Sequence, residues 1–265
     1  MTTSQETKDG ADRPQADSAV YVYGIVPGDV EVEESAQGIG DPPAPVETVH
    51  EGDIAALVSV IAADRALGTP EDLQAHAKLL DGTAAVAPVL PLRFGAVMTD
   101  EDSVAEELLR EHHDEFAQAL KALEGHAEYV VKGRYDDEAF LTRLLSENKQ
   151  ARQLSDDIRN KPEDASRNSR IALGELIANA IESMRNADTK TVIDDLDGIA
   201  SQVNPREPTH EWDAVHVALL AKVERQAELE EVVGRLSENA GGRMKLRLLG
   251  PLAAYDFVVT ARAQG

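Results

Sequence analysis

Apolar residues recur along the chain with two different periods, which predicts a mixed fold of strands and helices. The first apolar run, AVYVYGIV at residues 19–26, is apolar on both faces and predicts a strand that is covered on both sides. Residues 46–61 predict two strands around a Glu-Gly-Asp turn at 51–53. Residues 27–45 are rich in Pro, Gly and Glu and predict a long loop between these strands.

Two helix starts in the first half carry capping signals. Thr69 offers a hydroxyl before Pro70, and Asp72 adds an acid at the third helical position, which is the pattern of a helix N-terminus. Thr99, followed by acidic residues, repeats this scheme. Between the two helices, the segment PVLPLRFGAVM at residues 88–98 predicts a short extended stretch, since its prolines suit the starts and edges of strands.

The second half of the chain is predicted to begin near Gly125. Residues 127–135 alternate as a strand with one solvated face. Residues 137–203 follow an almost wholly helical pattern that Pro162 divides, and the apolar stripes at 164–203 predict a helical hairpin. The remaining predicted elements are a strand at 214–221, a helix at 224–240, and strands at 243–250 and 254–259.

This order of elements predicts an α+β fold in two domains, with helices stacked on a mostly antiparallel sheet. The polar residues 1–18 predict a disordered tail. Residues 19–125 then form an N-terminal α+β domain. Residues 126–265 form a C-terminal α+β domain that contains the helical region 137–203.

Composition narrows the classes of function. The 265 residues are 42% hydrophobic but only 4% aromatic, and the absence of cysteine excludes disulfides and thiolate metal sites. No apolar run approaches the roughly 20 residues that span a bilayer. The first residues also lack the basic-then-apolar pattern of a secretory signal. We therefore expect a soluble cytoplasmic protein with no membrane partner.

The charge of the chain is strongly acidic and uneven. The formal net charge is −23, and residues 29–140 carry 25 acidic against 7 basic residues. An acidic surface repels phosphate backbones, so nucleic acid is not an expected partner. Residues 241–265 are net basic, which allows them to dock either on the acidic half of the same chain or on an acidic partner.

Known catalytic and metal-binding patterns are incomplete in this sequence. QGIGDPP at 37–43 lacks the third glycine of a dinucleotide loop, and DDLDG at 194–198 lacks two ligand positions of a calcium loop. In EHHDE at 111–115, adjacent histidines point about 100° apart on a helix, so they do not share one ion. We expect no catalytic residue, no metal and no cofactor, and we predict that the protein is not an enzyme.

Three separated segments carry a resemblance to a known family: YVYGIV at 21–26, VLPLRFGAVM at 89–98 and GPLAAYDFV at 250–258. In this order they resemble motifs of the GvpL/GvpF family of gas vesicle proteins, namely Tyr-x-Tyr-Gly-Ile, Pro-Leu-Arg-Phe-Gly-Thr-Val-Phe and Gly-Pro-Trp-Pro-Pro-Tyr-Ser-Phe-Val. This chain has Leu-Ala-Ala at 252–254 where the family has Trp-Pro-Pro, which removes a rigid corner. The matching positions are Tyr21, Tyr23, Gly24, Ile25, Pro91, Leu92, Arg93, Phe94, Gly95, Val97, Gly250, Pro251, Tyr255, Phe257 and Val258.

The resemblance implies a role in gas vesicles rather than catalysis. Members of that family are accessory or minor structural components that bind the hydrophobic major shell protein, limit its aggregation and help to nucleate the vesicle. The implied partners are this shell protein and other gas vesicle accessory proteins, and the implied place is the gas vesicle in the cytoplasm. The resemblance also implies that the second domain is a modified ferredoxin-like sandwich with a helical insertion. The alternative is a ferredoxin-like module that binds a small molecule, as a regulator or an enzyme.

The matched positions have both a structural and a partner-binding interpretation. Arg93 lies in an apolar run, so we favour a buried arginine that pairs with a carboxylate and stacks on Phe94 or a tyrosine, over one that contacts the shell protein. The helices at 164–203 could offer an amphipathic groove to a partner helix. We favour packing of their apolar stripes within the chain, which is the usual arrangement.

Overall fold

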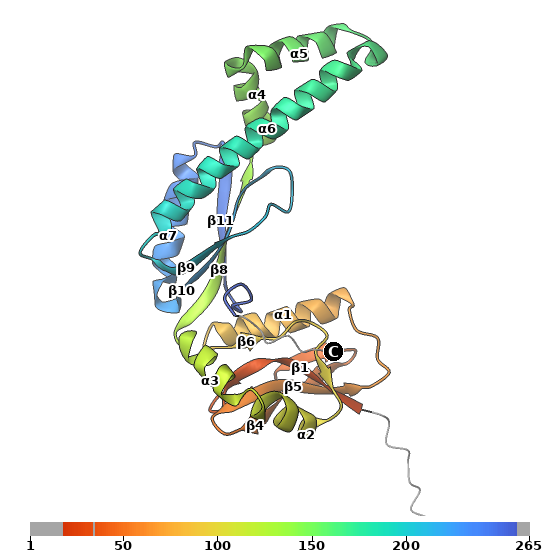
Figure 1. The fold of residues 1–265 in the computed structure, drawn as a ribbon, viewed down its shortest axis with the longest axis vertical. Helices are drawn as coiled ribbons and strands as arrows, with labels where there is room; N and C mark the ends of the chain where they lie inside the picture. The colour runs from red at the N-terminus through yellow and green to blue at the C-terminus, as the bar shows by residue number, and fades with distance from the viewer. Residues whose placement is uncertain (1–17, 34, 259–265) are drawn as a thin grey trace, which may run out of the picture.

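The computed structural model describes residues 18–33 and 35–258, so the predicted tail at 1–18 lies outside the described residues except for Ser18. The described residues form a five-stranded sheet, a four-stranded sheet and a small two-stranded sheet. Every strand pairing in the described ranges is antiparallel. The α+β class that the sequence predicts is therefore confirmed. Figure 1 shows the two larger sheets in separate parts of an elongated molecule.

The first sheet is built around the strand predicted at 19–26, and its order is β4-β5-β1-β6, with β7 also paired to β1. Its central strand lies at the core of this half because almost every residue of the run is buried. The strands are β1 (Ser18–Pro27), β4 (Glu47–Glu51), β5 (Ile54–Ala62), β6 (Leu90–Pro91) and β7 (Val97–Met98).

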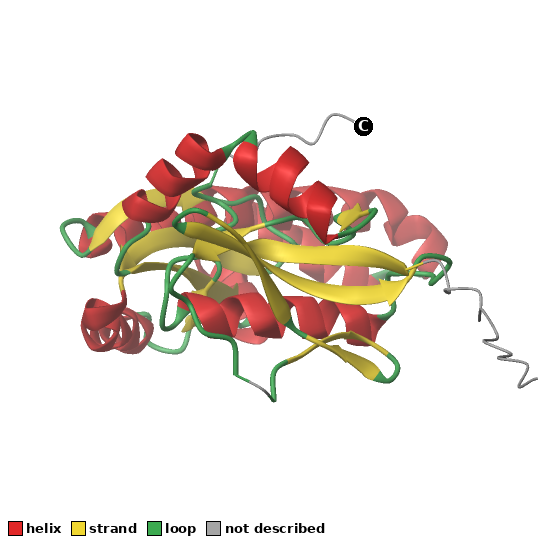
Figure 2. Cartoon of the chain, turned by 90° about the horizontal axis from the view of Figure 1, so that it is seen from below, coloured by secondary structure: helices red, strands yellow, loops and turns green. Residues whose placement is uncertain are grey.

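Helices cover both faces of the first sheet because the side chains of β1 alternate between two clusters. Val20 and Val22 pack with the helices that follow β7, whereas Tyr21 and Tyr23 pack with the preceding helix α1. Figure 2 shows helices on either side of these strands. The helices are α1 (Pro70–Ala84), α2 (Glu101–Ser103), η1 (Val104–Arg110, a π-helix) and α3 (His113–Ala122).

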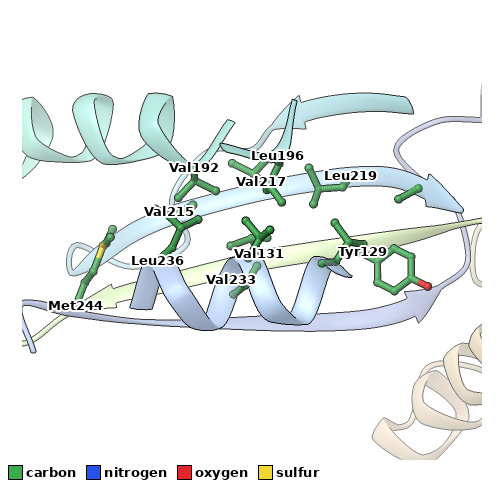
Figure 3. Packing of buried hydrophobic residues seen from close by; sticks show 14 of the residues in the cluster. Tyr129, Val131, Val192, Leu196, Val215, Val217, Leu219, Val233, Leu236 and Met244 are labelled. Atoms are coloured by element: carbon green, nitrogen blue, oxygen red, sulfur yellow. The ribbon is translucent and has the colours of Figure 1, made fainter. Parts of the chain in front are cut away.

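The second sheet has the strand order β11-β8-β10-β9. Two helices, α6 and α7, pack on one of its faces. Figure 3 shows their side chains, among them Val192 and Val233, meeting those of the central strands at Val131 and Val217. The elements are β8 (His126–Tyr135), β9 (Ala200–Pro205), β10 (Asp213–Lys222), η2 (Val223–Arg225), α7 (Gln226–Asn239) and β11 (Met244–Leu252).

A helical arm projects from the second sheet (Figure 1). It consists of α4 (Asp137–Glu147), α5 (Lys149–Asn160) and the first half of α6 (Glu163–Leu196). We define the arm as residues 137–180. The C-terminal half of α6 carries Ile181, Val192 and Leu196 into the core of the second sheet, so one helix supports both the arm and the core.

Four sequence predictions need correction in the boundaries of elements. The loop predicted at 27–45 contains a short hairpin, β2 (Gln37–Gly40) with β3 (Pro43–Pro45), which tertiary contacts hold rather than any alternating pattern. The helix predicted from Thr99 is capped one residue later, since the Asp100 side chain accepts from the Ser103 amide. The hairpin predicted at 164–203 is wrong, because α6 runs unbroken to Leu196 and residues 200–205 form β9. The helical pattern predicted from residue 137 to the break at Pro162 is itself divided into α4 and α5, because Asn148 caps α5.

Two further corrections concern the second sheet. Residues 253–258 form a turn rather than the strand predicted at 254–259, whose last residue lies outside the described residues. The strand at 127–135 is not solvated along one whole face. Its first half is buried on both faces, because the turn at 253–258 covers Glu128.

Candidate functional site

The three motif segments, which are far apart in sequence, meet beside α1. The first two are neighbours in the first sheet, since Gly24 pairs with Pro91 and Tyr21 pairs with Val97. The third begins in the last residues of β11 and reaches α1 from the second sheet (Figure 1), where the Ala253 amide donates to Asp81 Oδ1 at 2.9 Å. We call the meeting place of β1, α1, residues 92–96 and residues 250–258 the junction.

A chain of hydrogen bonds runs through the junction. The Gly95 amide donates to Tyr21 Oη at 3.2 Å, and Tyr21 Oη lies 2.8 Å from His76 Nδ1. On the other side of the ring, His76 Nε2 lies 3.0 Å from Tyr255 Oη, which donates to the Leu92 carbonyl at 3.4 Å. These groups are all satisfied if neutral His76 carries its proton on Nε2, accepting from Tyr21 and donating to Tyr255.

Burial keeps the groups of this chain uncharged. Desolvation raises the pKa of Tyr21 to about 12 and raises the pKa of Tyr255 as well. It also lowers the pKa of His76, which is 3% exposed, because the charged imidazolium is disfavoured away from water. At neutral pH the chain of Tyr21, His76 and Tyr255 therefore consists of neutral hydrogen-bonded groups.

Tyr23 organises the hairpin on the same side of the sheet. Its hydroxyl donates to Ser59 Oγ at 2.9 Å and accepts from the Ile39 amide at 2.9 Å. Gly38 is required at the contact, because a Cβ there would lie 1.8 Å from the Tyr23 hydroxyl oxygen. Tyr23 thus fixes β2 and β3 against the first sheet.

Gly24 permits the close approach of the central motif segment. A Cβ at this position would lie 2.7 Å from the carbonyl oxygen of Leu90 and 2.9 Å from the side chain of Leu80. Only glycine fits between strand β6 and helix α1 there. The motif glycine therefore lets β1 sit directly against both neighbours.

The C-terminal motif segment is anchored on the second sheet by an ion-pair cluster. Arg206, the residue after β9, donates to Glu128 Oε1 at 2.6 Å and to both carboxylate oxygens of Asp256, at 2.7 and 2.8 Å. The Asp256 amide donates to the other oxygen of Glu128 at 3.0 Å. Burial raises the pKa of Glu128, and Arg206 together with the Asp256 amide opposes this shift. The cluster compensates a carboxylate that is 2% exposed.

The same short segment packs on both halves of the molecule. Ala253 joins the apolar cluster that contains Tyr21 and Tyr23. Ala254 joins the cluster on the opposite face of the first sheet, which also receives Leu220 from the second sheet. Phe257 packs at the edge of that second cluster. Residues 250–258 therefore connect the two sheets through apolar contacts as well as polar ones.

The structure contradicts the prediction of a buried, paired Arg93. Its side chain is exposed, and among the described residues it forms no ion pair. Phe94, and not Arg93, faces the junction, since its ring centroid lies 5.8 Å from that of Tyr21 and 5.5 Å from that of His76. Gly95, with φ of +93°, completes a turn that leaves the preceding guanidinium in solvent.

Sequence reasoning missed the polar residues that complete the junction. His76 has no motif around it, although its spacing from Asp72 and Leu80 marks the buried face of α1. Glu128 and Arg206 are separated by 78 residues and carry no local signal of pairing. Such partners become visible only when the strands are placed side by side.

The chemistry of the junction suits attachment of segments rather than turnover. Both ring nitrogens of His76 are engaged, and Tyr21 is fully buried, so neither group can meet a substrate. Within residues 18–33 and 35–258, no group of three or more His, Asp or Glu side chains could hold a metal ion. Over the same ranges, none of the helices combines the length and apolarity needed to cross a membrane.

Comparison with known proteins gives one consistent result. Residues 19–259 match the family described as gas vesicle synthesis protein GvpL/GvpF. Gas vesicle protein F of a Streptomyces species is 33% identical over 241 residues, which cover 91% of this chain and 99% of that protein. Gas vesicle protein F of Dolichospermum flosaquae is 26% identical over 240 residues, covering 90% and 96% of the two chains. The crystal structure of GvpF from an Anabaena species shares the fold, with a TM-score of 0.73, 24% identity, and coverage of 91% of this chain and 98% of that one.

Proposed function

Because the chain belongs to the GvpL/GvpF family of gas vesicle synthesis proteins, we propose that it binds the hydrophobic major shell protein of gas vesicles and limits its aggregation. In this role it assists vesicle nucleation and assembly as an accessory or minor structural protein and not as an enzyme. Its place is the gas vesicle in the cytoplasm, with other gas vesicle accessory proteins as further partners. The observation that carries the proposal is the family match over residues 19–259.

Charge and shape support this role. A net charge of −23 opposes self-association and suits a protein that holds an aggregation-prone partner in solution. The elongated body with its projecting arm offers a large surface relative to its core (Figure 1). Neither feature requires catalytic chemistry.

We further infer that residues 19–125 and 126–258 act as two domains. Gly125, with φ of +69°, lies between α3 and β8, where the chain passes from one sheet to the other. The second part has the element order β-α-β-β-α-β and the strand order β11-β8-β10-β9, which supports a ferredoxin-like domain with the arm as its insertion. The junction joins the two.

Most motif positions support a structural role, and Arg93 supports a partner-binding one. The motif tyrosines and glycines are occupied by contacts within the chain, whereas the Arg93 side chain is exposed. We expect Arg93→Ala to change the free energy of unfolding by less than about 0.5 kcal/mol, as at other exposed positions. The same variant is expected to retain less shell protein than the wild type.

The test is co-expression of the major shell protein with and without this chain. The soluble fraction of the shell protein and its co-purification with the chain are measured together. We expect soluble, bound shell protein only when the chain is present. If neither quantity changes, the proposed function is wrong.

A further inference from the structure

A groove of about 640 Å³ lies along the outer side of α1. It is also lined by residues 30–33, 35–38 and 43, and by Leu57 of the first sheet. The described residues on its apolar surface are Val30, Val32, Ala36, Leu57, Leu79 and Val86. None of the junction's hydrogen-bonded groups lines it, so the groove is a separate feature of this half.

The side of α1 that lines the groove carries small residues, so another helix can approach it closely. Ala75 and Gly82 lie seven residues apart, which places them on the same side of the helix. A Cβ added to Gly82 would meet no atom within 4 Å. Val86, just beyond the helix, is 86% exposed and adds apolar surface at this end of the groove. Small residues on a helix allow another helix to pack at short distance.

The charges around the groove favour a basic occupant. Glu31 and Glu33 line the groove, and Lys78 is the single basic residue among the described lining residues. The surrounding residues 29–140 are strongly acidic as well. The side of α1 that lines the groove, from Ala75 to Thr83, is about 12 Å long at about 1.5 Å of rise per residue, so it matches roughly two turns of a partner helix.

We propose that this groove receives an amphipathic helix of the gas vesicle shell protein, with its apolar face against Leu79 and Val86 and a basic residue beside Glu31 and Glu33. This inference rests on the proposed function and names the surface that performs it. Burial of the helix's apolar face in the groove shields that face from other copies of the shell protein. The carboxylates of Glu31 and Glu33 select the orientation in which the helix binds.

The experiment fills the groove without disturbing the fold. Gly82→Leu places a large side chain in open space inside a helix, where leucine is favoured over glycine. The control is Gly174→Leu, which makes the same change at another open helical glycine, on the arm. Each variant is co-expressed with the shell protein, and bound shell protein and melting temperature are measured.

We expect Gly82→Leu to lower co-purified shell protein at least tenfold with no fall in melting temperature, while Gly174→Leu binds as the wild type does. We also expect Glu31→Lys combined with Glu33→Lys to weaken binding severalfold, mainly at low salt. Undiminished binding by Gly82→Leu overturns the groove but leaves the proposed function standing. Absence of binding by the wild type overturns both. If Gly82→Leu instead converts a dimer to a monomer and still binds shell protein, the groove is a self-association surface and the proposal is wrong.

Discussion

The junction and the arm hold their residues together in opposite ways. In the junction, His76 and Tyr255 are 179 residues apart in sequence, and each polar group is linked to a group from another segment. In the arm, the ion pairs are mostly local, as between Arg143 and Glu147, one helical turn apart. The family motifs concentrate in the first region. The motifs therefore mark where distant parts of this chain fit together.

This contrast has an energetic side. Long-range buried contacts form and break with the whole fold, whereas solvent-exposed local contacts can open alone. A substitution in the junction should therefore lower the stability of the entire molecule. A substitution at an exposed position of the arm should leave global stability almost unchanged.

The largest difference is expected for loss of a buried junction ring. Tyr21→Ala removes a fully buried side chain together with two hydrogen bonds, and should lower the free energy of unfolding by about 3–5 kcal/mol. Ile171→Ala on the arm, where the side chain is 53% exposed, should change it by less than about 0.5 kcal/mol. Urea unfolding of both variants makes the comparison. Equal losses would show that the two regions are not distinct.

The next effect concerns the ion-pair cluster. Arg206→Met leaves Glu128 buried without its cation and should cost about 2–3 kcal/mol, which is below the usual range for a buried pair because Arg206 is 29% exposed. Adding Glu128→Gln should recover part of this loss, because the uncompensated charge is then removed. Chemical denaturation of the single and double variants measures the coupling. A double variant that is less stable than Arg206→Met would contradict this account.

A smaller effect is expected from pH. Burial holds the pKa of His76 below its usual value, so below about pH 6.5 the unfolded chain takes up a proton that the folded chain resists. The contribution of His76 is therefore complete at neutral pH and is lost as the pH falls. A protonated ring would also direct a second N–H at the Tyr21 hydroxyl, which then has to give up its role as donor.

The measurement is the free energy of unfolding at pH 7.5 and pH 5.5 for the wild type and His76→Gln. The wild type should lose more stability on acidification than the variant. Other groups with shifted pKa values, such as Asp81, Glu128 and His113, are present in both proteins and cancel in the comparison. If the wild type and His76→Gln lose the same stability on acidification, the titration of His76 does not contribute to the pH dependence.

The smallest effect is expected for an exposed ion pair of the arm. Arg143 and Glu147 are 56% and 64% exposed, and their side chains approach to 3.0 Å. Arg143→Met should change the free energy of unfolding by less than about 0.5 kcal/mol, since water and salt already screen the pair. Thermal melts at low and high salt provide the check. A loss comparable to that of Arg206→Met would end the distinction between the two regions.

Local signals predicted the elements that depend on local order. The run at 19–26, apolar on both faces, and the Thr69 cap correspond to β1 and to the start of α1, where Thr69 accepts from the Asp72 amide. The break at Asn148 and the strand at 200–205 were missed, because a polar cap and a short edge strand resemble a continuing helical pattern. Periodicity alone does not distinguish these cases.

The candidate site was predicted in its parts and not in its assembly. The motif segments contain Tyr21 and Tyr255 of the junction, but no local pattern shows that Tyr255 returns to α1 or that Arg206 meets Glu128. The interpretation of Arg93 failed for a related reason. An apolar run predicts burial of the run as a whole, whereas a turn at Phe94 and Gly95 reverses which side chains face the core.

The position of the third motif segment sets an order of events during protein synthesis. A chain emerges from the ribosome N-terminus first, and its early parts begin to fold while later parts are still being made. Residues 253–258 come after every helix and strand of the described fold, yet they contact α1 and β8 directly. Translation must therefore pass all of these elements before the two sheets can be fastened together. A chain whose synthesis stops before residue 253 contains every strand of both sheets but lacks the contacts of this segment with α1 and β8. These contacts therefore form only after all the helices and strands have been synthesised.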